Sequence, residues 1–171
     1  MVIIITGASH TGKTALAQKI LEKYGFPYLS EDHLKMGLIR SGNTDLTPLS
    51  DDNSLTNYLW PIVREIIKTA IENNQNLTVE GCYVPFDWDK DFSKEYLDSI
   101  RCYCIVFTEK YICENFDNIK NYANVIENRL YDETGSPKAV IEENKKYKDF
   151  SMNGNTRQII IDKDYNIDIE I

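Results

Sequence analysis

The stretch VIIITGASHTGKT, residues 2–14, decides the fold of this 171-residue chain. Residues 2–5 form a continuous β-branched run, which is typical of a strand covered on both faces of a parallel sheet. Residues 7–14 follow with the spacing GxxxxGK[ST], and residues 15–21 then have the apolar spacing of a helix. A strand, a glycine-rich turn and a helix in this order predict a loop that binds phosphate groups.

The residue types in this loop explain how it would hold an anion. Gly7 and Gly12 allow backbone conformations that other residues avoid, so successive N–H groups can turn inward. The amino end of the following helix adds a positive partial charge. We expect Lys13 to reach the β- and γ-phosphates of ATP and the hydroxyl of Thr14 to bind Mg²⁺. The expected nucleotide-binding residues are Gly7, Ser9, His10, Thr11, Gly12, Lys13 and Thr14.

The rest of the chain alternates between strand-like and helix-like patterns. Further strands are expected at residues 27–30, 77–79, 102–107 and 158–161, and further helices at residues 31–40, 55–71, 111–131 and 138–148. Pro61 either starts or kinks one of these helices, and residues 166–171 form either an edge strand or a frayed tail. The alternation predicts an α/β fold of three layers, with about five parallel strands and helices on both faces.

Acidic residues follow two of the expected strands, at the edge of the sheet where ligands bind in open α/β folds. Glu80 ends a strand and is expected to hold Mg²⁺ together with Thr14 and to lie against the substrate; otherwise it is a capping acid at a turn. Asp32 would accept a proton from a substrate hydroxyl, or act only as a favourable acid at a helix start. Glu31 takes this role if the strand ends one residue earlier.

Two arginines are candidates for binding anionic groups, because a guanidinium can donate two parallel hydrogen bonds to a phosphate. Arg129 lies after the fourth expected strand, where a lid would close over phosphates, and is expected to stabilise the transferring group. Arg40 ends a helix and faces the loop that follows, so we expect it to contact the substrate. The expected substrate segments are loops 41–53 and 84–91, with a lid region at 111–137.

Composition excludes several other classes of protein. The chain has 19 Lys and Arg against 27 Asp and Glu, a net charge of −8, which is poorly suited to a nucleic-acid backbone. Its N-terminal apolar run is far shorter than the roughly 20 residues of a membrane span, and no signal peptide is expected.

The cysteine spacing indicates where the protein is located, and the chain length indicates how many domains it has. The four cysteines have no CxxC spacing, and with two His they predict reduced thiols in a cytoplasmic protein rather than a zinc site. The length predicts a single domain over residues 1–171, as a monomer or a homodimer.

With these residues placed, the sequence resembles the P-loop small-molecule kinases, the group of adenylate kinase, gluconate kinase, zeta-toxin-type kinases and 2-phosphoglycerate kinase-like proteins. Residues 7–14 carry most of the resemblance. SEDHLK at 30–35 resembles the acidic, substrate-facing segment of the group, and LTVEG at 77–81 resembles its third strand. The resemblance implies an α/β, three-layer P-loop NTPase fold of the nucleoside monophosphate kinase-like kind, with an about five-stranded parallel sheet and helices on both faces. Adenylate kinases carry Asp-Gly-Phe-Pro-Arg after that strand, whereas residues 80–85 read EGCYVP, which argues against AMP as the acceptor.

These observations predict an ATP- and Mg²⁺-dependent kinase that transfers the γ-phosphoryl group to a small-molecule acceptor. A nucleotide, a sugar- or glycerate-like compound and an antibiotic hydroxyl all stay open as the acceptor. The catalytic residues in this hypothesis are Lys13, Asp32 and Arg129. The alternative is a nucleotide-binding switch or a slow ATPase without a small-molecule acceptor. The guanine-selecting sequence Asn-Lys-x-Asp is absent, which disfavours a regulatory GTPase.

Overall fold

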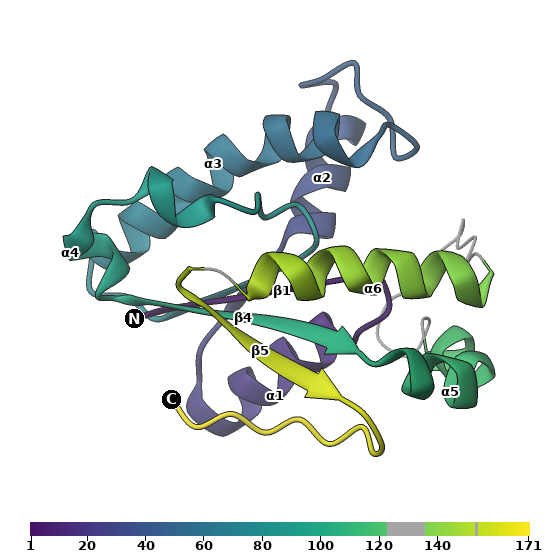
Figure 1. Cartoon of the computed structure of the whole chain (residues 1–171). Helices are drawn as coiled ribbons and strands as arrows, with labels where there is room; N and C mark the ends of the chain where they lie inside the picture. The colour runs from purple at the N-terminus through teal and green to yellow at the C-terminus, as the bar shows by residue number, and fades with distance from the viewer. Residues whose placement is uncertain (123–135, 153) are drawn as a thin grey trace.

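The computed structural model describes residues 1–122, 136–152 and 154–171. In these residues a five-stranded sheet has the order β2-β3-β1-β4-β5, and every neighbouring pair is parallel (Figure 1). The strands are β1 (Val2–Gly7), β2 (Tyr28–Ser30), β3 (Leu77–Glu80), β4 (Ile100–Phe107) and β5 (Thr156–Ile161). The helices are α1 (Lys13–Tyr24), α2 (Glu31–Arg40), α3 (Asp52–Glu72), η1 (Trp88–Asp91), α4 (Lys94–Leu97), α5 (Glu109–Tyr122) and α6 (Pro137–Ser151). The predicted α/β class and parallel sheet are confirmed.

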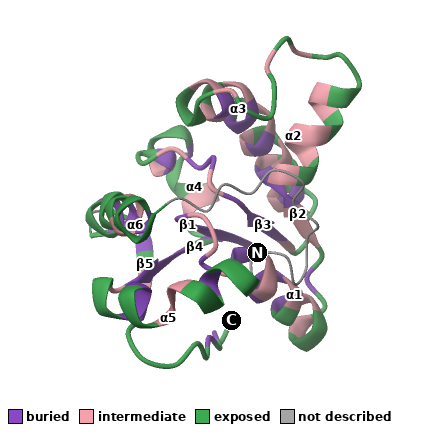
Figure 2. Ribbon diagram, turned by 90° about the vertical axis from the view of Figure 1, so that its right-hand side faces the viewer, coloured by how far each residue is buried: buried purple, intermediate pink, exposed green. Residues whose placement is uncertain are grey.

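Helices cover both faces of this sheet and give the molecule three layers. One apolar cluster joins the sheet to α3, η1 and α6, and includes Val63, Ile67, Trp88 and Phe150. The other joins it to α1, α5 and the end of the chain, and includes Leu16, Ile20, Ile112 and Ile167. In β1, residues 2 and 4 enter the first cluster and residues 3 and 5 the second, which explains the continuous apolar run. Figure 2 shows the buried strands between the more exposed helices.

The pairing register brings the carboxyl ends of three strands to one edge. Ile5 of β1 pairs with Glu80 of β3, and Glu80 pairs on its other side with Ser30 of β2. The N–H of Gly81 then donates to the carbonyl oxygen of Ile5 at 3.1 Å. The glycine-rich loop, Glu80 and the start of α2 therefore lie together, as the sequence predicted.

The long helix α3 differs from its prediction at its start. It begins at Asp52 because the Asp51 side chain caps it, accepting a hydrogen bond from the backbone N–H of Ser54 at 3.0 Å. Pro61 lies inside this helix and is exposed, so the prediction that it starts the helix was wrong.

The acidic and aromatic stretch 84–91 is more ordered than a plain loop. Its last four residues form η1, and Trp88 is only 2% exposed. The indole Nε1 of Trp88 donates to the hydroxyl of Thr156 at 3.0 Å, which ties the stretch to β5. This aromatic residue therefore belongs to the core, and a substrate role for the stretch stays a prediction.

The chain after β5 forms no strand in the structure, so the edge-strand alternative for residues 166–171 was wrong. The segment lies along α1 instead. Lys23 forms an ion pair with Asp168 at 2.8 Å, and the Tyr24 hydroxyl donates to the carbonyl oxygen of Ile169 at 3.0 Å. We call residues 162–171 the C-terminal segment.

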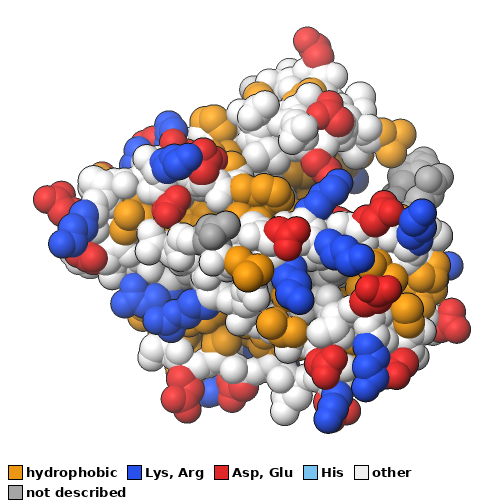
Figure 3. All heavy atoms as spheres, viewed as in Figure 1, with side chains coloured by type: hydrophobic (Ala, Val, Ile, Leu, Met, Phe, Trp, Pro, Cys, Tyr) orange, Lys and Arg blue, Asp and Glu red, His pale blue; other side chains and the backbone are white. Residues whose placement is uncertain are grey.

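The charged side chains and two of the cysteines lie where their residue types are expected. On the face drawn in Figure 3, Lys and Arg side chains are interspersed with Asp and Glu. Cys102 and Cys104 are buried in β4 as free thiols. None of the helices in the described residues is long and apolar enough to cross a lipid bilayer.

Truncating a core side chain of α3 should destabilise the protein. Ile67 is fully buried, and Ile67→Ala should lower the free energy of unfolding by about 2–5 kcal/mol, because it leaves a cavity against the sheet. Leu49 is 85% exposed, and Leu49→Ala should change it by less than about 0.5 kcal/mol. Urea unfolding followed by circular dichroism measures both, and equal losses would contradict the assigned packing.

Candidate active site

The loop between β1 and α1 has the backbone geometry that its glycines predict. Gly7 has φ +146°, and a Cβ at this position would overlap the carbonyl oxygen of Ile105. Gly12 has φ +81° and caps the start of α1. His10 also has a positive φ of 63°, which is uncommon for a residue other than glycine. The loop therefore turns through three left-handed or otherwise restricted positions before the helix begins.

Lys13 is folded into this loop rather than extended into solvent. It is 8% exposed, and its ammonium group donates to the carbonyl oxygens of Gly7 at 3.1 Å and Ala8 at 2.8 Å. The hydroxyl of Thr11 donates to the same Ala8 carbonyl at 2.8 Å. The structure therefore places one positive charge at the loop, as an anion-binding site requires.

Thr14 and Glu80 are brought together by the alignment of β1 and β3. The Thr14 hydroxyl donates to Oε2 of Glu80 at 3.2 Å, and Glu80 is 3% exposed. A hydroxyl and a carboxylate fit Mg²⁺, which binds through few protein oxygens and keeps water and phosphate oxygens as its other ligands. No cluster of three or more His, Cys, Asp or Glu that could hold a metal occurs in the described part of the chain. A metal at this pair would be completed by water or phosphate oxygens.

Glu31 is buried completely at the first position of α2. Its Oε2 accepts the backbone N–H of Tyr83 at 2.8 Å, while its Oε1 has no hydrogen-bond partner among the described residues. Desolvation raises the pKa of Glu31 to about 8; Glu80 and Asp32 act in the same direction, and the Tyr83 N–H and Lys13 oppose it. A carboxyl group that is largely protonated at pH 7 is a poor proton acceptor, so burial makes Glu31 the weaker candidate for the predicted base.

Asp32 belongs to a polar group that spans α2 and the turn after β3. Lys35 lies between two partners, with its ammonium 2.5 Å from Oδ1 of Asp32 and 2.8 Å from the hydroxyl of Tyr83. The same ammonium lies 4.9 Å from the centroid of the Tyr83 ring. The Asp32 side chain is 32% exposed and the Lys35 side chain 12%. Of these three, only Asp32 was identified from the sequence as a site residue.

Two further side chains hold the loop, and sequence reasoning missed both. Oε1 of Glu143 in α6 accepts hydrogen bonds from the backbone N–H of Ser9 at 2.9 Å and from its hydroxyl at 3.1 Å. The Tyr165 hydroxyl, in the C-terminal segment, donates to the carbonyl oxygens of Thr11 at 3.1 Å and Gly12 at 3.2 Å. Burial raises the pKa of Tyr165 to about 12, so this hydroxyl keeps its proton. Both contacts join residues more than 100 positions apart, and no local pattern in the sequence signals them.

Of the two predicted arginines, Arg40 does not join this group. Arg40 is the exposed last residue of α2, and the rise of a helix puts it about 12 Å along the axis from Asp32. Arg129 lies outside the described residues. Their roles toward substrate and transferring phosphate stay predictions.

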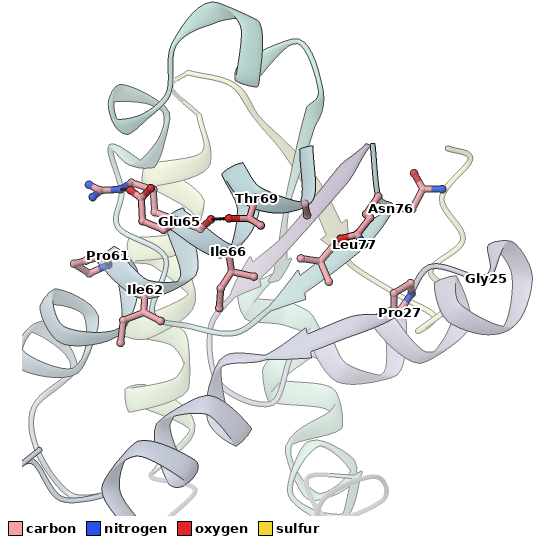
Figure 4. Close-up of a pocket in the computed structure, with 12 residues that line it drawn as sticks. Gly25, Pro27, Pro61, Ile62, Glu65, Ile66, Thr69, Asn76 and Leu77 are labelled. Carbon is pink, nitrogen blue, oxygen red and sulfur yellow. Dashed lines mark hydrogen bonds and ion pairs between the residues drawn. The ribbon is translucent and has the colours of Figure 1, made fainter. Parts of the chain in front are cut away.

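A separate groove lies at the other end of the sheet (Figure 4). It runs between the second half of α3 and the residues that begin β2 and β3, among them Pro27, Ile66 and Leu77. Arg64 and Glu65 are its charged lining residues, and they form an ion pair with each other at 2.8 Å. The residues of the candidate active site, Gly7, Gly12, Glu31, Asp32 and Glu80, do not line this groove, so it is a different site.

Comparison with known proteins identifies the architecture. No protein-family model and no curated protein matches the chain. A gluconokinase from Sinorhizobium meliloti 1021 superposes with a TM-score of 0.54 at 15% identity, over 93% of this chain and 81% of that one. A sugar kinase from Janibacter sp. HTCC2649 superposes with a TM-score of 0.55 at 12% identity, over 94% of this chain and 84% of that one.

The chain shares the fold of these two kinases. The fold expected from residues 2–14 and from the alternation of strands and helices is thereby confirmed over nearly the whole chain. At such low identity the likeness concerns the fold, and the chemistry has to be argued from the side chains at the site.

The buried carboxyl of Glu31 should make stability depend on pH. Its pKa is about 8 in the folded state against 4.5 when unfolded, so the folded state keeps a proton that the unfolded state releases. The free energy of unfolding should therefore fall as the pH rises from about 5 to about 8. Glu31→Gln should remove this fall, since an amide cannot ionise and its carbonyl oxygen can still accept the Tyr83 N–H.

Urea unfolding at three pH values, with the exposed α5 variant Glu114→Gln as control, measures this dependence. The control should follow the wild type. Parallel pH profiles for the wild type and Glu31→Gln would show that Glu31 is not protonated in the fold.

Proposed function

We propose that the chain is an ATP- and Mg²⁺-dependent kinase that transfers the γ-phosphoryl group to a small-molecule acceptor. One observation carries this proposal. The edge of the sheet that holds the loop and Lys13 also holds the Thr14–Glu80 pair and, next to it, Asp32. Phosphoryl transfer requires these three parts, a phosphate cradle, a metal site and a group that receives the acceptor's proton.

Each residue has a separate part in this proposal. Lys13 and the N–H groups of the loop bind the phosphates, aided by the amino end of α1. Thr14 and Glu80 hold Mg²⁺, which neutralises charge on the phosphates when it is bound. Asp32 orients the acceptor hydroxyl and takes its proton. Catalysis of this kind consists mainly of positioning and electrostatics, which a compact domain can supply.

The structural neighbours suggest which acceptors to try first. Both are named as kinases of sugars or of a sugar acid, so polyols, sugars and aldonates are the first acceptors to test. Arg129 and Arg40 stay candidates for the transferring group and for the substrate. A cytoplasmic location and a monomeric or homodimeric state also stay part of the proposal. The names of these neighbours favour a small-molecule acceptor over the alternative, a nucleotide-binding switch or a slow ATPase without one.

Removing the ammonium of the loop should weaken the binding of nucleotide. Lys13→Ala should weaken the binding of Mg-ATP by about 10- to 100-fold, because hydrogen bonds to charged groups are worth about 1.5–3 kcal/mol each. Transfer should fall below detection. Isothermal titration calorimetry gives the affinity, and Lys110→Ala, an exposed position on α5, is the control. Wild-type turnover in Lys13→Ala would overturn the assignment of the site.

Neutralising Asp32 should separate transfer from nucleotide binding. Asp32→Asn should lower phosphoryl transfer by about 10²- to 10⁴-fold, the usual contribution of a general base. The affinity for Mg-ATP should stay the same, since Asp32 is assigned to the acceptor. Transfer is measured with labelled ATP and a panel of acceptors, and the exposed Asp98→Asn is the control. An unchanged ATPase rate with no phosphorylated acceptor would support the switch instead.

A further inference from the structure

We propose that Tyr165, in the C-terminal segment, is a positioning residue of the glycine-rich loop. Its hydroxyl sets the direction of the N–H groups of Gly12 and Lys13, which bind phosphate. This inference rests on the proposed function, since it concerns the phosphate-binding part of that same site. Tyr165 takes no part in the transfer step itself and acts through the backbone of the loop.

The hydroxyl of Tyr165 lies against two consecutive peptide groups. Its oxygen is 3.1 Å from the carbonyl oxygen of Thr11 and 3.2 Å from that of Gly12, so its single proton is shared between them. Both carbonyl oxygens therefore face the C-terminal segment. A trans peptide group is planar, and its N–H points opposite to its C=O. The N–H groups of Gly12 and Lys13 consequently point away from this segment.

These two N–H groups lie where a backbone can bind an anion. Gly12 is left-handed, with φ +81° and ψ +28°, and the right-handed helix α1 begins at Lys13. Such a change of hand directs successive N–H groups to one side and forms an anion-binding concavity. The carbonyl oxygen of Gly12 also accepts the N–H of Leu16 at 3.0 Å, which aligns the Lys13 N–H with the open amino end of α1.

Gly12 and the Tyr165 hydroxyl fit each other at close range. A Cβ on residue 12 would overlap this hydroxyl. The position therefore requires glycine for two reasons, its positive φ and the oxygen packed against it. A hydrogen bond to a carbonyl oxygen also polarises the N–H of the same peptide group, which makes that N–H a stronger donor to phosphate.

Packing fixes the place of the Tyr165 ring, and with it the place of the hydroxyl. The ring meets Phe107 edge to face, with centroids 6.3 Å apart and planes at 80°, and Phe107 is 6% exposed at the end of β4. Further along the segment, Ile167 is 3% exposed and its carbonyl oxygen accepts from Nζ of Lys19 at 3.3 Å. The segment runs beside α1 (Figure 1), so the sheet and α1 both anchor it.

The first half of the loop is held in a different way. The N–H of Ser9 donates to the carboxylate of Glu143 at 2.9 Å, so this N–H is already paired with an acid of α6. The N–H groups that Tyr165 directs belong to the second half of the loop and to the start of α1. Phosphate binding should therefore depend strongly on the half of the loop where Tyr165 acts.

Removing the hydroxyl alone tests this role. Tyr165→Phe keeps the ring beside Phe107 and deletes the hydrogen bonds to the loop. The dissociation constant of Mg-ATP, measured by isothermal titration calorimetry, should rise about 10-fold, because two donors to phosphate lose their set direction. Inorganic tripolyphosphate with Mg²⁺, measured by its displacement of Mg-ATP, should lose affinity by the same factor. Neither measurement needs an acceptor.

Tyr24→Phe is the matched control. The Tyr24 hydroxyl also joins α1 to the C-terminal segment by donating to a backbone carbonyl oxygen, that of Ile169 at 3.0 Å. It does so at the last residue of α1, about 16 Å along the helix axis from Lys13. Each variant should lower the melting temperature by about 2–4 °C, since each loses one hydroxyl group. Tyr24→Phe should bind Mg-ATP within about twofold of wild type.

The outcomes separate this inference from the proposed function. A wild type that binds neither Mg-ATP nor tripolyphosphate would overturn the kinase function and the role of Tyr165 together. Binding by the wild type, with unchanged affinity in Tyr165→Phe, would overturn only the positioning role. Equal losses of affinity in Tyr165→Phe and Tyr24→Phe would show a merely structural segment. A loss confined to Mg-ATP would show a hydroxyl that contacts the nucleoside, and either of these results would also overturn the proposal.

Discussion

The parallel pairing of β1, β3 and β2 in one register is the constraint on which the candidate site depends. It sets Ile5, Glu80 and Ser30 in a single row, so that whatever follows each strand emerges at the same edge. The glycine-rich loop follows β1, the turn with Tyr83 follows β3, and α2 with Asp32 follows β2. A shift of one residue in either pairing would reverse the faces of the strand and separate Glu80 from Thr14.

Sequence reasoning reached the parts of the fold that are encoded locally. The run at 2–5, the glycine spacing at 7–14 and the apolar spacing of α3 each specify their own element, and the rule for parallel strands then places Glu80 beside Thr14. The acids after the strands were identified in the same way. The base was left open between Glu31 and Asp32, because their difference is burial, which depends on the turn that packs over Glu31.

The residues that escaped prediction depend on contacts between distant parts of the chain. Glu143, Tyr165 and Lys35 lie on surfaces of helices or in an irregular segment, where charged and aromatic residues are common and carry no signal of their own. Gly81 gives a clearer lesson. The sequence predicted only that Gly81 lies at the end of a strand. The structure shows that this position must lack a side chain, because a Cβ there would overlap the Glu31 carboxyl. A glycine can thus mark a close neighbour rather than a special turn.

The loop is braced from both layers of helices. Glu143 reaches Ser9 from α6, whose Tyr147 and Phe150 pack on the α3 face of the sheet, while Tyr165 reaches Thr11 and Gly12 from the C-terminal segment on the α1 face. Such bracing means that much of the conformational entropy of the loop is already lost when the chain folds. A ligand that fits the loop then gives up little of its binding free energy to order the backbone, so the affinity of the site is set in part by two residues that need not touch the ligand.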